Sequence, residues 1–241
     1  MYTAVYYADT EPFRDDALFA EALSCLPPQR LDKTARLRSV PDKALSLGAG
    51  LLLMKAIRSL LPEGRDLSEQ LITGKLCFSY GEHGKPYLPG VSDFHFNISH
   101  SGSIAALAVS DREIGCDLER IRLADLRIAR RFFSEKENEL LDAAASKEEQ
   151  NALFYRLWTL RESFLKVTGK GLSLSMRDFA IVLEEGQAKP DAVRVLRCAD
   201  DQEYYYAEPS IAPGYCFALC RAGEYCKPSV HPVDFRADCT L

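Results

Sequence analysis

Two carboxylates stand two residues apart in the short apolar stretch of residues 114–119, Ile-Gly-Cys-Asp-Leu-Glu. Because alternate residues of a strand face opposite sides, Asp117 and Glu119 share one face, and the apolar residues beside them share the other. Two carboxylates this close repel each other unless a cation binds them or one is protonated. Mg²⁺ takes oxygen ligands and often shares one or two carboxylates with a substrate phosphate. The stretch therefore predicts either a metal-binding strand or, as the alternative, an edge strand with a solvated polar face.

The residues before this stretch predict a strand that leads into it. Residues 104–109 are rich in Ala, Val and Ile, and residues 110–112, Ser-Asp-Arg, can form a short turn. Residues 114–119 are accordingly expected to form the next strand of a hairpin with residues 104–109.

The composition is that of an ordinary globular protein. The 241 residues suffice for one large domain or two small ones, and a net charge of −5 argues against a broad nucleic-acid interface. No apolar run is long enough to span a bilayer and the N-terminus lacks signal-peptide features, so a cytoplasmic protein is expected. The eight cysteines include no Cys-x-x-Cys pair, which favours scattered reduced thiols over a zinc site.

The order of the expected elements indicates two mixed halves. Strand, helices and strands are followed by a second series of strands, helices and strands. The expected fold is α+β, with two pseudo-symmetric halves, residues 1–112 and 113–241, each a small, mainly antiparallel sheet packed on helices. Asp117 and Glu119 fall near the seam between the halves, where ligand sites are common.

Individual segments carry their own expectations. Residues 41–61 predict a central core helix in which Gly48 and Gly50 pack closely against another element, whereas residues 63–70 are typical of a polar connector. Strands are expected at residues 179–183, 193–196, 203–207 and 215–220, and the tail from Ala222 is expected to be loose.

A long helix is expected over residues 147–168, with a capping box at its start. Trp158, Glu162 and Lys166 follow one another at intervals of four, so they share one face of this helix. Glu162 and Lys166 could form a simple surface ion pair. Alternatively, Glu162 supplies a third carboxylate to the metal, and Lys166 reaches a phosphate oxygen.

Residues with phosphate-binding chemistry also lie earlier in the chain. Lys85 stands in a rigid Gly-Lys-Pro loop, and residues 97–101, Asn-Ile-Ser-His-Ser, offer polar donors and a histidine. Arg30 and Lys33 add positive charge. With one carboxylate metal site, this set fits phosphoryl-type transfer from a polyanionic substrate. The sequence has no Walker A loop and no Gly-x-Gly-x-x-Gly motif, so the common nucleotide-binding folds are not indicated.

Three segments resemble the signature motifs of the 4′-phosphopantetheinyl transferases, in their larger, monomeric Sfp-type class. They are residues 96–101 (Phe-Asn-Ile-Ser-His-Ser), 114–120 (Ile-Gly-Cys-Asp-Leu-Glu-Arg) and 158–166 (Trp-Thr-Leu-Arg-Glu-Ser-Phe-Leu-Lys). Residues 84–86, 131–134 and 169–173 extend the resemblance, which covers residues 75–175 well. The motifs occur in the order and spacing of the family.

The resemblance implies an enzyme that moves the 4′-phosphopantetheine arm of coenzyme A onto a serine of an acyl or peptidyl carrier protein, releasing 3′,5′-ADP. By the same resemblance, Asp117, Glu119 and Glu162 hold Mg²⁺, with Mn²⁺ as the alternative, on the coenzyme A pyrophosphate. Glu162 or a metal-bound water is the implied base for the carrier serine. Lys166 is implied to stabilise charge on the transferred phosphate.

The resemblance also assigns the nucleotide contacts. Lys85, Ser99 and His100 are implied to contact the nucleotide part of coenzyme A. His100 and the basic residues Arg30 and Lys33 would lie near its 3′-phosphate.

Two positions depart from the family pattern. The helix motif carries Arg161 where the family usually has lysine, but the charge is kept and the side chain lies off the metal-facing stripe, so little loss is expected. The family also carries an arginine for the 3′-phosphate where this chain has Ala44 or Leu45. Lys43, beside them, is expected to substitute for it. Glu137 matches a family position that is sometimes given a catalytic role.

Residues 120–133 are basic and apolar in an otherwise acidic chain. A solvated helix face is one interpretation; the one preferred is a docking surface for an acidic carrier protein, because complementary charge steers encounter. A chain with both halves needs no partner to complete its site, so a monomer is expected. The segment contains Arg120, Arg122, Arg127, Arg130 and Arg131 against one acid, Asp125, with Leu123, Leu126, Phe132 and Phe133 interleaved.

Two other functions could use the same residues. One is a metal-dependent phosphohydrolase, against which the Asn-Ile-Ser-His-Ser segment and the helix motif argue. The other is a coenzyme A- or carrier-binding module that has lost catalysis, although the carboxylates and Lys166 are all present. The sequence leaves the natural carrier and its pathway open.

Overall fold

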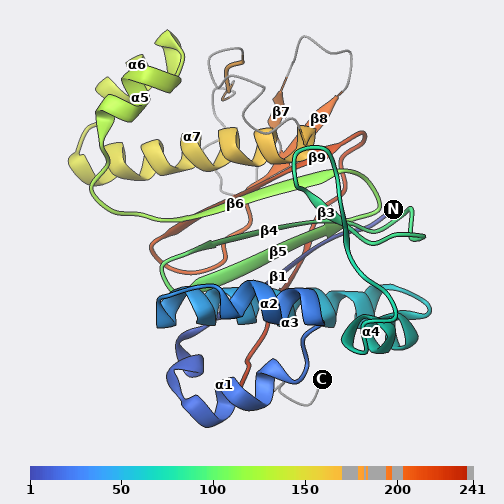
Figure 1. Cartoon of the computed structure of the whole chain (residues 1–241). Helices are drawn as coiled ribbons and strands as arrows, with labels where there is room; N and C mark the ends of the chain where they lie inside the picture. Colours follow the sequence, from blue (N-terminus) through green and yellow to red (C-terminus); the bar gives the residue numbers. More distant parts are fainter. Residues whose placement is uncertain (170–178, 182, 184–193, 197–202, 238–241) are drawn as a thin grey trace.

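Two sheets lie between two layers of helices in the computed structural model, which describes residues 1–169, 179–181, 183, 194–196 and 203–237. Figure 1 shows α3 (Val40–Leu60) across one side of the strands and α7 (Lys147–Thr168) across the opposite side. The α+β architecture of two small, mainly antiparallel sheets packed on helices is therefore confirmed. None of the described helices combines the length and the apolar composition needed to cross a bilayer.

The first sheet has the strand order β10-β1-β5-β4. Its central strand β5 (Ile104–Ser110) pairs antiparallel with β1 (Thr3–Asp9) and with β4 (His95–Ser101), and β10 (Ser229–Pro232) pairs parallel with β1. Both faces of β5 are buried, because Leu107 and Val109 pack toward the first core and Ala106 and Ala108 toward the second sheet.

The second sheet has the order β6-β9-β8-β7, all antiparallel. Its strands are β6 (Ile114–Arg120), β9 (Tyr215–Ala222), β8 (Tyr204–Ala207) and β7 (Arg194–Leu196). The expected hairpin of residues 104–109 with 114–119 is wrong, because β6 pairs with β9 and not with β5. Both edges of β5 are already occupied by β1 and β4, so residues 111–113 carry the chain into the other sheet.

The two sheets pack face to face through small and apolar side chains. Ala106 and Ala108 of β5 meet Cys116 and Leu118 of β6, together with Phe217 of β9. Because the alanine side chains are small, the backbones of the two sheets approach closely. Burial of the apolar side chains in this layer holds the two halves together.

The remaining helices pack chiefly on α3 or on α7 and not directly on the sheets. The residues expected to form a polar connector, 63–70, are instead mostly helical, because Leu67 and Leu71 on one face pack into the first core. The close packing expected at Gly48 is confirmed, since a Cβ there would lie 2.7 Å from Thr10 Cγ2. The further elements are η1 (Glu11–Arg14), α1 (Asp16–Leu23), α2 (Pro28–Ala35), α4 (Gly64–Ile72), β2 (Ser79–Tyr80), β3 (Pro86–Tyr87), α5 (Leu126–Phe132) and α6 (Glu135–Asp142).

Residues 229–235 of the C-terminal tail are not loose, contrary to expectation. After β9 the chain returns to the first half, where β10 extends the sheet and Val233 N–H donates to Tyr7 O at 2.9 Å. Phe235 is 3% exposed, and its ring lies 4.7 Å from that of Phe13. The tail thus belongs structurally to the sheet of residues 1–112. Its apolar residues are separated by Pro, His and Asp, which hid this anchoring in the sequence.

Some of the expected strands lie partly outside the residues that the structure describes. Residues 179–181 are not in a strand, and most of residues 182–193 lie outside the described residues. Six described cysteines are free thiols, as expected, whereas Cys198 and Cys239 fall outside.

The tail anchor gives a stability prediction. Phe235→Ala should lower the free energy of unfolding by about 3–5 kcal/mol, because it leaves a cavity beside Phe13. Urea unfolding followed by circular dichroism measures this, with Val230→Ala on exposed β10 as the control, expected to change it by less than about 0.5 kcal/mol. Equal, small losses for both variants would show that the tail does not anchor.

Candidate active site

The edges of the two sheets meet along β4 and β6, and side chains connect them. Asn and Ser side chains at every second residue of β4 accept backbone N–H groups from every second residue of β6, at 2.9–3.1 Å. These hydrogen bonds take the place of a backbone ladder along this edge of β6. The pairs are Cys116 N–H to Asn97 Oδ1, Leu118 N–H to Ser99 Oγ, and Arg120 N–H to Ser101 Oγ.

The two serines of this side-chain ladder also orient the carboxylates of β6. Ser99 Oγ donates to Asp117 Oδ1 at 2.9 Å, and Ser101 Oγ donates to Glu119 Oε2 at 2.8 Å. Each hydroxyl therefore accepts from the backbone of β6 and donates to a neighbouring carboxylate of the same strand. Asp117 and Glu119 lie on one face, as predicted.

Helix α7 packs directly on β6 at Gly115. A Cβ at this position would lie 2.2 Å from Ser163 O and 2.4 Å from Val167 N, so only glycine fits without displacement. This contact places Glu162 and Lys166 over the polar face of β6. Lys166 Nζ donates to Asp117 Oδ1 at 2.6 Å and, across the seam, to Ser99 Oγ at 3.3 Å, so this lysine does not simply form a surface ion pair with Glu162.

The carboxylates perturb one another. Burial, the charge of Asp117 and that of Glu119 raise the pKa of Glu162, and burial together with Asp117 raises the pKa of Glu119. Burial disfavours the charged form of Lys166, but the charge and hydrogen bond of Asp117, together with Cys116 and Glu162, outweigh it, and the pKa of Lys166 is raised. The cluster is therefore a set of like charges that Lys166 neutralises in part.

The donor set fits a hard cation. It offers carboxylate oxygens from Asp117, Glu119 and Glu162, and Asp117 Oδ2 is buried without a hydrogen-bond partner. An orphaned buried carboxylate oxygen is costly unless a cation or donor reaches it. Lys166 at present pairs with Asp117. Within the described residues, no three side chains of His, Cys, Asp or Glu lie close enough together to hold a metal ion without moving.

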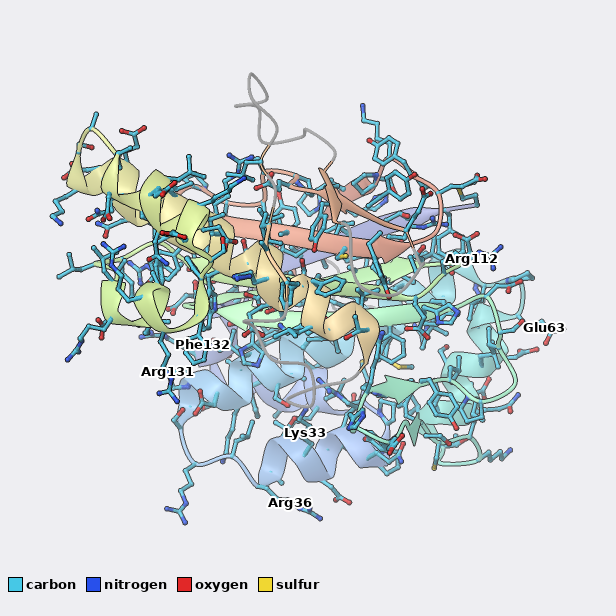
Figure 2. The ribbon with its side chains drawn as sticks, turned by 90° about the horizontal axis from the view of Figure 1, so that it is seen from above. Lys33, Arg36, Glu63, Arg112, Arg131 and Phe132 are labelled. Atoms are coloured by element: carbon cyan, nitrogen blue, oxygen red, sulfur yellow. The ribbon has the colours of Figure 1, made fainter. Side chains whose placement is uncertain are left out.

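His100 lies close enough to Lys33 and to Lys166 to interact with both electrostatically. Burial, Lys166 and Lys33, in that order, lower the pKa of His100, which places both lysines within electrostatic reach of the imidazole. Figure 2 shows Lys33 and Arg36 directed away from the body of α2. Arg30 is more enclosed, because its Nη2 donates to Ser46 O of α3 at 2.8 Å.

The position of the missing family arginine is closed to a ligand. Ala44 and Leu45 are buried, at 4% and 6% exposure, within α3. Lys43, one residue earlier, is half-buried and can reach the surface.

Lys85 lies at the opposite end of β6 from Glu119. Its Nζ donates to Glu113 Oε2 at 2.6 Å and to Ile114 O at 3.0 Å. The side chain borders a cavity of about 840 Å³ between the β2–β3 hairpin and the C-terminal end of α7. The structure therefore brings Asp117, Glu119 and the α7 pair together and leaves Lys85 further along the same strand.

Arg161 departs from the family pattern without entering the polar cluster. It is fully buried, 3.1 Å from Glu137 Oε2, and donates to Phe132 O and Phe179 O. Glu137 is also buried, and it caps α6 through Ser134 N–H. This pair therefore fixes α5 and α6 on α7, and removing one partner of a buried ion pair costs about 3–5 kcal/mol.

Sequence reasoning missed three positioning roles. The period of two in Asn97, Ser99 and Ser101 is the signal that could have placed their side chains on one face, but nothing in it shows that they accept the N–H groups of β6. Gly115 carried no sign of its contact with α7, and Glu113 no sign of its pairing with Lys85.

Comparison with known proteins identifies the family. Profiles described as "4′-phosphopantetheinyl transferase superfamily" and "4′-phosphopantetheinyl transferase, N-terminal" match residues 113–220 and 11–112. The chain is 35% identical to 4′-phosphopantetheinyl transferase Sfp of Bacillus subtilis (strain 168) over 222 residues, covering 91% of this chain and 88% of that protein. The chain therefore belongs to the 4′-phosphopantetheinyl transferase superfamily.

Two further relatives carry the same family name. The chain is 38% identical to 4′-phosphopantetheinyl transferase ffp of Bacillus subtilis, over 69% of this chain and 70% of that protein. It is 30% identical to 4′-phosphopantetheinyl transferase gsp of Aneurinibacillus migulanus, over 76% of this chain and 70% of that protein.

The contact at Gly115 gives a second prediction. Gly115→Ala should force α7 away from β6 and lower the free energy of unfolding by about 1–3 kcal/mol, as overpacking does. Thermal or urea unfolding measures the loss. Gly81→Ala is the matched control, since a Cβ there would come no closer than 3.7 Å to another residue. Equal stability of the two variants would contradict the close contact.

Proposed function

We propose that this chain transfers the 4′-phosphopantetheine arm of coenzyme A to a serine of an acyl or peptidyl carrier protein and releases 3′,5′-ADP. The observation that supports it most strongly is the polar cluster at the seam, where Lys166 of α7 pairs with the Asp117 that Ser99 orients. The chain belongs to a family with this activity. The cluster supplies the groups that transfer from a diphosphate needs.

Asp117, Glu119 and Glu162 are proposed to hold Mg²⁺, with Mn²⁺ as the alternative. The buried, unpartnered Asp117 Oδ2 supports this assignment. When bound, the ion would neutralise charge on the pyrophosphate of coenzyme A. Lys166 and Ser99 then remain beside the same carboxylate to position a phosphate oxygen.

Glu162 is proposed as the base that takes the proton of the carrier serine. Its carboxylate is half-buried, and its pKa is raised by burial and by Asp117. A raised pKa makes a carboxylate a stronger base. Lys166, one helical turn further on, lies where it can stabilise charge on the transferred phosphate.

The nucleotide part of coenzyme A is proposed to extend from this cluster along the seam. His100 is electrostatically coupled to Lys33 and to Lys166, so His100 and Lys33 suit the 3′-phosphate. Lys43 and Arg30 are proposed to add to this positive field, and Lys85 and Ser99 to contact the nucleotide. One chain supplies all of these residues, so we expect a monomer.

Residues 120–133 are proposed as the docking surface for the carrier. Arg120 immediately follows the carboxylate Glu119, so a carrier bound here would hold its serine near the polar cluster. Leu123 is 81% exposed, which provides an apolar anchor among the arginines. Arg131 and Phe132 lie at the surface of α5 in Figure 2.

The direct test is the intact mass of an apo carrier protein after incubation with this protein, coenzyme A and Mg²⁺. The carrier should gain one phosphopantetheine, and Glu162→Gln should lower the rate at least about 100-fold, as expected for loss of a general base. Glu148→Gln, an exposed change at the start of α7, is the matched control and should leave the rate unchanged.

The outcomes separate the competing functions. Coenzyme A binding without transfer to any of several carriers would support a binding module instead. Release of phosphate without transfer would support a phosphohydrolase. Full activity of Glu162→Gln would remove the assigned role of Glu162.

The docking surface has its own prediction. Arg127→Glu combined with Arg130→Glu should raise the carrier KM about tenfold, because the change places negative charge opposite an acidic partner. The KM for coenzyme A should not change. Arg65→Glu with Lys75→Glu, an equal reversal at exposed positions of the first half, is the control. If the two double variants raise the carrier KM equally, the net charge of the protein and not this surface determines docking.

A further inference from the structure

Lys85 is held by two acceptors at the start of β6. Its ammonium donates to the carboxylate of Glu113 at 2.6 Å and to the carbonyl of Ile114 at 3.0 Å. Lys85 comes from the first half, and Glu113 directly precedes the strand that carries Asp117 and Glu119. The contact therefore crosses the seam at the end opposite Glu119.

Glu113 is itself fixed. Its other carboxylate oxygen lies 3.0 Å from His95 Nδ1, and its carbonyl accepts Ala222 N–H at 2.9 Å. His95 and Lys85 hold the pKa of Glu113 down to about 2, so the carboxylate stays ionised. Glu113 is thus a charged anchor on the second sheet.

The same contact fixes the tip of the β2–β3 hairpin. The base of the hairpin is fastened to α2, because Gln29 exchanges two hydrogen bonds with the backbone of Phe78. Within the tip, Gly81 N–H donates to Lys85 O at 2.9 Å. Lys85 is therefore the link by which this turn is set against β6.

The pairing decides what Lys85 can still bind. A lysine ammonium has three N–H donors, and two are directed to Glu113 and Ile114. One donor remains, and Glu113 cancels the charge. A phosphate approaching this donor would meet the negative carboxylate, whereas a neutral ring nitrogen or carbonyl would not. The adjoining cavity of about 840 Å³ is lined by aromatic residues, of which Tyr87 is exposed, together with the polar side chains of Glu82, His83 and His95. Such a mixed lining suits an uncharged ring that carries polar atoms.

We propose that Glu113 is a positioning residue for coenzyme A: it fixes Lys85 so that the remaining N–H donates to a neutral acceptor of the substrate and not to a phosphate. This inference rests on the proposed function, because coenzyme A is the substrate it assumes. It assigns a specificity role to Glu113, which acts through Lys85.

The test is titration calorimetry of the full chain with coenzyme A and with dephospho-coenzyme A, which lacks the 3′-phosphate. Glu113→Gln should raise the Kd for both about tenfold and by the same factor, as expected for one loosened charge-assisted hydrogen bond. Glu113→Asp should recover part of the affinity. Glu63→Gln, an exposed change of the same kind outside this cavity, is the control and should bind like the wild type.

A double-mutant cycle shows whether Glu113 acts through Lys85. In a Lys85→Met background, Glu113→Gln should cause no further loss of affinity. In carrier labelling, Glu113→Gln should raise the KM for coenzyme A and leave kcat within about twofold, a split that general destabilisation would not produce.

Several results would overturn the proposal. Tighter binding by Glu113→Gln would show that a freed Lys85 serves a phosphate, and a loss confined to coenzyme A would place the 3′-phosphate there. Wild-type affinity in Glu113→Gln would show that Glu113 positions nothing. If the wild type labels a carrier and one of these results holds, this inference alone fails; if the wild type neither binds coenzyme A nor labels a carrier, the proposed function fails with it.

Discussion

The side-chain ladder between β4 and β6 is the interaction on which the site depends. Asn97, Ser99 and Ser101 accept the N–H groups of β6 where a backbone strand would otherwise pair. The two serine hydroxyls in turn donate hydrogen bonds to the carboxylates of Asp117 and Glu119. The same two serine hydroxyls therefore bind the backbone of β6 and orient its carboxylates, so the site cannot shift without the seam opening.

Crowding of like charges follows from this arrangement. Burial and the charge of Asp117 raise the pKa of Glu119 and that of Glu162, which lies above the strand. Gly115 allows α7 to approach closely enough for Lys166 to reach Asp117 at 2.6 Å. Lys166 thus neutralises part of the negative charge of the polar cluster, while the buried Oδ2 atom of Asp117 has no hydrogen-bond partner.

The sequence predicted chemistry better than connectivity. The face shared by Asp117 and Glu119, the core role of residues 41–61 and the family followed from local pattern and motif. The hairpin and the loose tail were wrong, because each depended on which edges and cores were already occupied. Neither the full edges of β5 nor the pocket beside Phe13 is visible in a linear sequence.

The sequence alone determined which groups are present and how they are spaced: two carboxylates on one strand face, and a carboxylate and a lysine one helical turn apart. The period of a strand and of a helix fixes such relations locally. Only the tertiary structure decided that Lys166 pairs with Asp117, that Glu113 holds Lys85, and that Arg161 is buried on Glu137. These contacts join residues distant in sequence, and the packing of sheet on sheet and helix on sheet selects them.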